Sequence, residues 1–220
     1  MASPQWPAGP ASPELRPGAV QVWRIFLSAP PSFPDTLAAE ELSHAVRFHF
    51  ERHRMHYVIA RGALRMLAAR YLGCEPGELR FDVNPHGKPF LPAARLQFNL
   101  AHSHELALVA FTLDAEIGID LEWRASRIRL DEMASAILSP NELEVWKELS
   151  ENDRHRSFFW HWTAKEAYLK ALGVGLSKNP KTIETVSLPI RELIVETEYV
   201  AALATLGDGV PEVQQFTFCP

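Results

Sequence analysis

The chain has 220 residues, a formal net charge of −5 with neutral histidines, and 47% hydrophobic residues, which is enough for a hydrophobic core. This balance gives no sign of nucleic-acid or membrane binding, and no apolar stretch approaches membrane-spanning length. The cysteines Cys74 and Cys219 have neither disulfide nor metal-site spacing, and the N-terminal segment lacks a secretory pattern. We therefore expect a cytoplasmic protein with reduced thiols.

The first half of the chain is expected to start with a disordered, Pro-rich tail over residues 1–18. Turn-forming residues predict a loop over 84–89, and Gly73 is a natural helix stop. Strand and helix patterns predict strands over 20–29, 79–83, 96–103 and 106–111, and helices over 35–50 and 52–72.

The second half repeats this alternation. Ser139 and Glu142 form a capping-box pattern with Pro140 at the first helical position. Patterns predict a strand over 117–123, helices over 140–149 and 157–172, and strands over 185–189, 193–199 and 213–218. The order of elements predicts an α+β fold with two similar halves that meet near residue 113.

Two acids stand in the apolar segment IGIDLEW, residues 117–123. Alternate residues of a strand point to opposite faces, so Gly118, Asp120 and Glu122 share one face and the other face is wholly apolar. Paired carboxylates suit Mg²⁺, with Mn²⁺ as the alternative. A strand with one buried and one solvated face would also account for the two acids.

A second group of functional residue types lies in WTAKEAYLK, residues 162–170. Residues four apart share a helical face, so Trp162, Glu166 and Lys170 line up. A neighbouring stripe of mostly small apolar residues suits close packing and consists of Trp160, Ala164, Ala167 and Ala171. The alternative for Glu166 and Lys170 is a surface ion pair.

Several basic residues could meet a phosphate. Three arginines recur at seven-residue intervals and a fourth follows one turn later: Arg47, Arg54, Arg61 and Arg65. On a continuous helix they would form one basic line, although a solvated helix face gives the same pattern. Lys88 in its loop and His102 at a strand end could also bind phosphate, or could have structural roles only.

Taken together, FNLAHSHELALVAF (98–111), GIDLE (118–122) and WTAKEAYLKALGVGL (162–176) resemble the 4′-phosphopantetheinyl transferases of the surfactin-synthetase-activating type. The GKP loop and the arginine-bearing helix upstream are also similar, so the resemblance covers residues 20–218. It implies transfer of the 4′-phosphopantetheine group of coenzyme A to a serine of an apo acyl or peptidyl carrier protein. The by-product would be 3′,5′-adenosine bisphosphate, and the enzyme would be a holo-[carrier protein] synthase.

The resemblance also implies a fold and a site. The fold would be a monomeric pseudo-dimer, with residues 19–113 binding coenzyme A and 114–220 carrying the metal site and catalysis. Asp120, Glu122 and Glu166 would bind Mg²⁺, and Glu166 and Lys170 would be catalytic. The residues matched to the coenzyme A site are Arg47, Arg54, Arg61, Lys88, Pro89, Asn99, His102, Ser103 and Lys170.

One departure from the family pattern is Ala101, which stands where a serine usually precedes the motif histidine. Two other functions would use some of the same residue types. A Mg²⁺-dependent phosphohydrolase acting on nucleotides would also need paired acids and basic residues. A non-catalytic module that binds coenzyme A or a carrier would need neither the three acids nor Lys170, so their retention argues against it.

Overall fold

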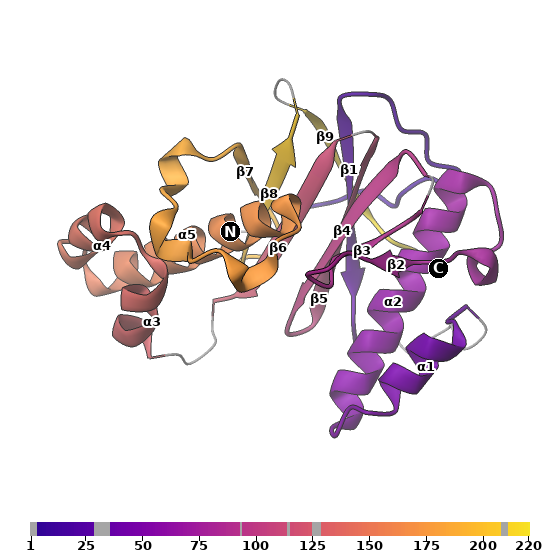
Figure 1. The fold of residues 1–220 in the computed structure, drawn as a ribbon, viewed down its shortest axis with the longest axis horizontal. Helices are drawn as coiled ribbons and strands as arrows, with labels where there is room; N and C mark the ends of the chain where they lie inside the picture. Colours follow the sequence, from indigo (N-terminus) through magenta and orange to yellow (C-terminus); the bar gives the residue numbers. More distant parts are fainter. Residues whose placement is uncertain (1–3, 29–35, 93, 114, 125–128, 208–210) are drawn as a thin grey trace.

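Two helices of 22 residues, α2 (Glu51–Leu72) and α5 (Glu151–Leu172), organise the chain into two similar halves (Figure 1). The computed structural model describes residues 4–28, 36–92, 94–113, 115–124, 129–207 and 211–220. Each long helix ends at a glycine in the left-handed conformation, Gly73 with φ 65° and Gly173 with φ 66°, which confirms both predicted helix stops.

The remaining elements follow the same alternation of strands and helices. The first half contains β1 (Ala19–Phe26), α1 (Ala39–Ala45), a 3₁₀ helix (Pro76–Glu78), β2 (Asp82–Val83), β3 (Pro89–Phe90), β4 (Leu96–Ser103) and β5 (Leu106–Leu113). The second contains β6 (Glu116–Trp123), α3 (Leu130–Ile137), α4 (Pro140–Lys147), 3₁₀ helices at Gly175–Ser177, Pro180–Thr182 and Thr185–Ser187, β7 (Ile190–Leu193), β8 (Tyr199–Leu206) and β9 (Glu212–Thr217). No helix in the described ranges is long and apolar enough to cross a membrane.

The strand pairing repeats between the halves. β1 pairs antiparallel with β5, which pairs with β4; in the same way β6 pairs antiparallel with β8, which pairs with β7. Thus β1, α2, β4 and β5 correspond in order to β6, α5, β7 and β8. This repetition confirms the predicted α+β pseudo-dimer.

One strand breaks the repetition. β9, from the end of the chain, pairs parallel with β1 and extends the first sheet to the order β4-β5-β1-β9. Residues 212–217 therefore lie with the first half in space. Apart from this strand, the division of the chain into an N-terminal half, 19–113, and a C-terminal half, 114–220, stays a prediction.

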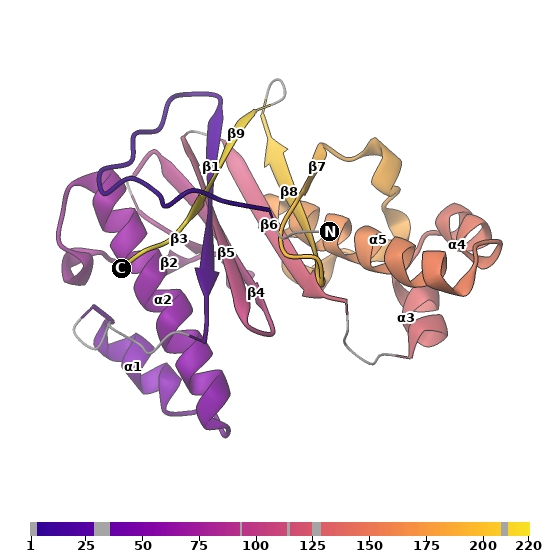
Figure 2. The same cartoon turned by 180° about the vertical axis from the view of Figure 1, so that it is seen from behind.

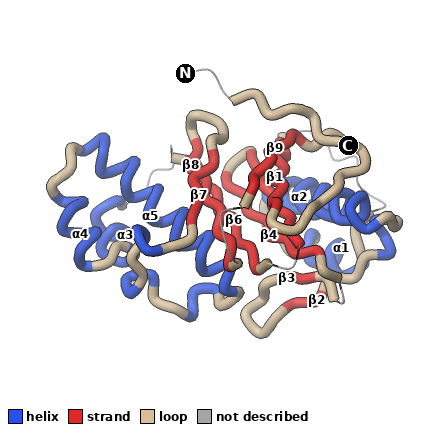
Figure 3. Tube along the Cα trace, turned by 90° about the horizontal axis from the view of Figure 1, so that it is seen from above, coloured by secondary structure: helices blue, strands red, loops and turns tan. Residues whose placement is uncertain are grey.

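The two sheets lie between two groups of helices, as the view from above shows (Figure 3). α2 packs on the outer face of the first sheet and α5 on that of the second. The core between the sheets includes Val20, Val22, Leu108, Ile117, Ile119, Leu121 and Leu203. The three β6 residues of this set are at most 1% exposed, which confirms that one face of β6 is apolar and buried.

The expected disordered tail differs from the structure from residue 4 onward. The N-terminal segment runs across the back of β1 toward β7 (Figure 2). Trp6 is 7% exposed and its Nε1 donates to the Ile194 carbonyl at 3.1 Å. Thr217 N donates to the Pro7 carbonyl at 2.7 Å, and Gly9 N donates to the Thr217 carbonyl at 3.0 Å. A buried indole and a backbone bridge order this segment despite its Pro-rich composition.

Several predicted elements near the C-terminus are wrong. Residues 185–187 form a 3₁₀ turn rather than a strand, and Val186 is 93% exposed. The predicted strand 193–199 is largely a loop, and the segment that pairs with β6 is the later β8. β8 is rich in alanine because α5 packs closely on it, and this composition gives a weak strand signal.

The first half and the helical region also differ from expectation. Helix α1 ends at Ala45, and the strand expected over 79–83 is reduced to two residues of β2. Helix α3 was not predicted, and α5 begins six residues earlier than expected, at Glu151. The capping box of α4 is confirmed, because Ser139 Oγ accepts from Glu142 N and Glu142 Oε2 accepts from Ser139 N.

Helix α5 approaches β6 at Gly118. A Cβ atom at this position would lie 2.0 Å from the Ala167 carbonyl oxygen and 2.3 Å from Ala171 N, both backbone atoms of α5. The alanine stripe predicted on this helix is fully buried at Ala164, Ala167 and Ala171. Small residues on both elements therefore determine how near the helix lies to the strand.

We predict that Gly118→Ala lowers the free energy of unfolding by about 1–3 kcal/mol, because the added methyl group must push α5 away from β6. Urea unfolding followed by circular dichroism measures the change. Gly77→Ala is the control: a Cβ there meets no atom within 4 Å, and the change should stay within about 0.5 kcal/mol. Equal effects of the two substitutions would contradict the close approach.

Candidate active site

The face of β6 that carries Asp120 is covered by α5 at Gly118 and Asp120. Asp120 is 5% exposed, and its Oδ1 accepts a hydrogen bond from Lys170 Nζ at 2.6 Å. Its other oxygen, Oδ2, is buried and accepts no hydrogen bond from any described residue. The alternative of a solvated strand face is therefore wrong for Asp120, and the surface-pair alternative is wrong for Lys170, whose ion-pair partner is Asp120.

Two further carboxyl groups, those of Glu122 and Glu166, lie near this pair. Burial raises the pKa of Glu122 to about 7, and the nearby charge of Asp120 adds to the rise. Burial and the same Asp120 charge also raise the pKa of Glu166. These shifts arise because acids of like charge share a desolvated space, and the Lys170 ammonium offsets their repulsion only in part.

Strand β4 supplies the next residues of the site. Desolvation, followed by the charge of Lys170, lowers the pKa of His102. Ser103 Oγ donates to Glu122 Oε2 at 3.1 Å and accepts from Trp123 N at 3.0 Å. Asn99 is 5% exposed and its Oδ1 accepts from Ile119 N at 2.8 Å. Ser103 and Asn99 thus hold β6 against β4, and Ser103 also orients one acid.

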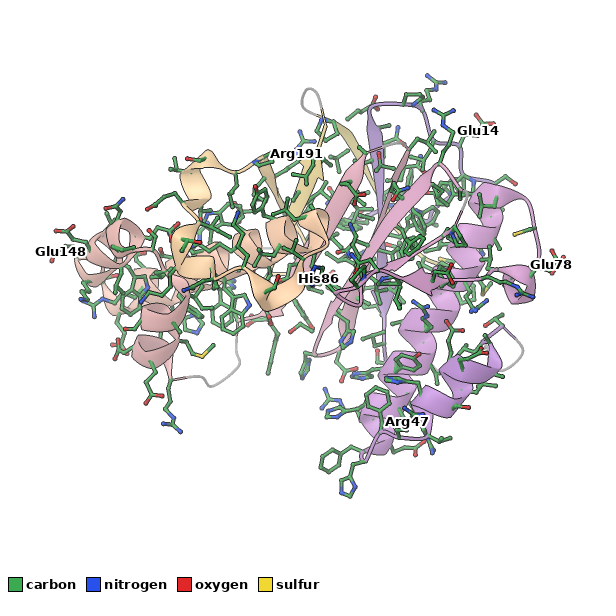
Figure 4. The ribbon with its side chains drawn as sticks, viewed as in Figure 1. Glu14, Arg47, Glu78, His86, Glu148 and Arg191 are labelled. Carbon is green, nitrogen blue, oxygen red and sulfur yellow. The ribbon has the colours of Figure 1, made fainter. Side chains whose placement is uncertain are left out.

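Arg54, Arg61 and Arg65 all lie on α2, but Arg47 precedes this helix, so the four arginines do not form the predicted line. The chain leaves the helical conformation after Ala45, and Phe48 turns inward to pack on Tyr57 with ring centroids 5.4 Å apart. Arg47 lies in this connection, exposed, at the lower end of α2 (Figure 4).

The other arginines pair with acids of their own half. Arg54 pairs with Glu51, and both Arg61 and Arg65 pair with Glu41 of α1. The guanidinium of Arg61 also lies over the Phe81 ring at 4.5 Å. The structure therefore does not bring Arg54 and Arg61 together with Arg47 in one row.

The GKP loop lies beside the end of α5. Figure 4 shows His86 of this loop near that end of the helix. Lys88 Nζ donates to Glu116 Oε2 at 2.8 Å, to the Ile117 carbonyl at 3.1 Å and to the Ala171 carbonyl at 3.2 Å. Pro89 opens β3 directly after it. The Lys88 ammonium is thus bound to protein groups of the second half.

Sequence reasoning missed one buried charged residue next to Glu166. Lys165 is 1% exposed and pairs with Glu142, the acid of the α4 capping box. Glu142 Oε1 also accepts from Thr185 N at 2.8 Å, and hydrogen bonds from His161, Lys165 and backbone groups outweigh its burial and lower its pKa. The capping pattern identified Glu142, but nothing local to residue 165 indicates this partner.

The acids of this site suit a divalent cation whose remaining ligands are water molecules and oxygen atoms of a substrate. Within the described ranges no three His, Cys, Asp or Glu side chains form a group able to hold a metal by themselves. Asp120 has a buried oxygen without a hydrogen-bond donor, and Glu122 lies on the same face of the strand. Two carboxylates completed by water and substrate phosphate oxygens are a usual Mg²⁺ arrangement.

Comparisons with known proteins match almost the whole chain to one family of enzymes. Residues 116–208 match the family model "4′-phosphopantetheinyl transferase superfamily", and residues 28–113 match "4′-phosphopantetheinyl transferase, N-terminal". The chain is 37% identical over 224 residues to 4′-phosphopantetheinyl transferase HetI of Nostoc sp., an alignment that covers 93% of this chain and 94% of that protein.

More distant relatives carry similar names. A 4′-phosphopantetheinyl transferase of Bacillus subtilis is 30% identical, with 64% of this chain and 62% of that protein covered. The L-aminoadipate-semialdehyde dehydrogenase-phosphopantetheinyl transferase of Schizosaccharomyces pombe is 27% identical, with 81% and 74% covered.

The raised pKa of Glu122 predicts a pH-dependent stability in the absence of divalent cations. A carboxyl whose pKa is higher in the folded state favours folding while it is protonated. Its contribution is full below about pH 4.5 and is lost as the pH rises through about 7. Glu122→Gln removes this dependence, so the variant should gain about 1–3 kcal/mol relative to the wild type between pH 4.5 and 8.

Urea unfolding at the two pH values in the presence of a chelator measures this gain. Glu148→Gln, at the exposed end of α4, is the matched control and should leave the pH dependence unchanged. A gain at Glu122 no larger than the gain at Glu148 would contradict the raised pKa.

Proposed function

Because this chain belongs to the 4′-phosphopantetheinyl transferase superfamily, we propose that it transfers the 4′-phosphopantetheine group of coenzyme A to a serine of an apo carrier protein. The observation that carries this proposal is the meeting of Asp120, Glu122 and Glu166 with Lys170 at the contact of β6 and α5. A module that only binds coenzyme A needs no such group of acids.

We also propose the surfactin-synthetase-activating subtype, with acyl or peptidyl carriers as acceptors. Two similar halves in one chain, which supply an internal pseudo-two-fold axis, support this subtype and a monomeric enzyme. The same halves would divide the work, with coenzyme A bound mainly by residues 19–113 and catalysis in 114–220. The proposed coenzyme A residues are Arg47, Arg54, Arg61, Pro89, Asn99, His102 and Ser103. Lys88, whose ammonium is bound to protein groups of the second half, is given a positioning role below instead.

The proposed reaction forms a bond from the serine oxygen to the β-phosphorus of coenzyme A and breaks the bond from that phosphorus to the bridging oxygen. Glu166 would take the serine proton, because a carboxylate with a raised pKa is a better base near neutral pH. Lys170 would stabilise the charge on the departing 3′,5′-adenosine bisphosphate. His102 would contact a phosphate.

Asp120 and Glu122, with Glu166 as a third acid nearby, are the residues that would hold Mg²⁺, or Mn²⁺ in its place, together with water and phosphate oxygens. When bound, the cation would neutralise charge on the pyrophosphate. It would also favour the ionised forms of Glu122 and Glu166, whose pKa values are raised without it.

The proposal is tested by incubating the protein with coenzyme A, Mg²⁺ and a panel of apo carriers, followed by intact-mass measurement of each carrier. A phosphopantetheine mass gain on at least one carrier is expected. Release of inorganic phosphate from nucleotides without any mass gain would favour the phosphohydrolase, and coenzyme A binding alone would favour the non-catalytic module.

We predict that Asp120→Asn lowers kcat for transfer by at least about 100-fold, because it removes the charge that pairs with Lys170 and would bind the cation. Circular dichroism should show a folded protein. Asp131→Asn, an exposed residue in the first turn of α3, makes the same chemical change and should keep full activity. Transfer by Asp120→Asn within threefold of the wild type would refute the assignment.

We further predict that Arg47→Ala raises the KM for coenzyme A about tenfold, because a charge-assisted contact to the 3′-phosphate is lost. The KM for dephospho-coenzyme A, which lacks that phosphate, should change less than threefold. Arg191→Ala, on β7 of the other half (Figure 4), is the control and should alter neither value. Equal losses for both substrates in Arg47→Ala would rule out the 3′-phosphate contact.

A further inference from the structure

The loop 84–88 between β2 and β3 is a closed turn. Asn84 N donates to the Lys88 carbonyl and Gly87 N donates to the Asn84 carbonyl, each at 2.9 Å. Asn84 Oδ1 accepts from both His86 N and Lys88 N at 2.9 Å. Gly87 takes the left-handed conformation, with φ 85°, that lets the turn close. With these groups bonded, the loop is a rigid support for side chains that leave it.

The Asn84 side chain uses its other end to reach the second half. Its Nδ2 donates to the carbonyl of Gly173, the residue that ends α5, at 2.7 Å. Carbonyls at a helix C-terminus lack partners within the helix, so this bond satisfies one of them. A Cβ atom on Gly173 would lie 2.9 Å from Asn84 Nδ2, so the contact is also close-packed.

The Lys88 side chain joins the same end of α5 to the start of β6. Its three donors are bound by the Ala171 carbonyl of α5 and by the Ile117 carbonyl and Glu116 carboxylate of β6. The side chain is only 14% exposed. A cation at a helix C-terminus is also favoured by the helix dipole.

These bonds lie next to the residues proposed for catalysis. Lys170 directly precedes Ala171 on α5, with Glu166 one turn earlier, and Asp120 lies three residues after Ile117 on β6. We propose that Asn84 and Lys88 form a latch, defined by these two side chains, that places α5 against β6 for transfer. Both are positioning residues, and this inference rests on the proposed function.

The latch is tested by steady-state kinetics of Asn84→Asp, Lys88→Met and the double variant, with coenzyme A and an apo carrier varied separately. Each single variant should lower kcat about tenfold with the KM for coenzyme A within twofold, since small misplacements of catalytic groups cost rate. The double variant should lose no more than the worse single variant, because both residues act through one latch.

The control is Asn179→Asp, the same change at an exposed turn where Asn179 Oδ1 accepts only from Lys181 N among described residues. It should leave kcat unchanged. Amide hydrogen exchange supplies a readout that does not require transfer: in Asn84→Asp and Lys88→Met the last turn of α5 should exchange faster, and α2 should not.

A rise in the KM for coenzyme A with unchanged kcat would overturn the latch and make Lys88 a ligand contact. Unchanged kcat together with unchanged exchange would also overturn it. If Asn84→Asp melts below the assay temperature, Lys88→Met decides, because the aliphatic part of its side chain is retained. If the wild type transfers to no carrier but the two variants still exchange faster than the wild type at the end of α5, the proposed function is refuted and the latch stands.

Discussion

The contact between α5 and β6 at Gly118 is the constraint on which the rest of the site depends. Without a side chain at this position the helix backbone lies directly on the strand. That closeness lets Lys170, on the helix, reach Asp120 on the strand, and keeps water from one Asp120 oxygen. The same close approach explains the alanines of α5 and β8, because larger side chains there would push the helix away from the sheet. Close packing of the helix and the Asp120–Lys170 ion pair therefore depend on the same small residues.

The acids at this contact are costly in the free protein. Glu122 and Glu166 both have raised pKa values because burial and Asp120 disfavour their ionised forms, and Lys170 offsets only part of this. Such strain is typical of sites that await an opposite charge, and it would be relieved by a bound cation. The buried acids therefore lower the stability of the free protein, and a bound cation would restore part of it.

Sequence patterns predicted the elements with strong periodicity and the residues within them. The alternation around Asp120 and the four-residue spacing of Glu166 and Lys170 identified a site whose members lie far apart in the chain. What could not be predicted depends on tertiary partners: Lys165 with Glu142, and Asn84 with Gly173. Strand β8 was not predicted because alanine is a weak strand former. Its alanines are explained by the packing of α5, a helix distant in sequence, on this strand. The alternative of a solvated face for Asp120 is wrong because the helix that covers this face, α5, comes from a distant part of the chain.

The exchange of chain ends between the halves has a consequence for biosynthesis. β1 is completed on one edge by β9, and the segment at Pro7 and Gly9 is held by Thr217, near the other terminus. During synthesis the β1 edge of the first sheet therefore stays unpaired until residues 212–217 have been made. Unlike a tandem pair of independent domains, the first half takes an edge strand from a segment that follows the second half in sequence, so removal of residues 212–217 would expose the β1 edge and leave the β6-β8-β7 sheet with all its strands.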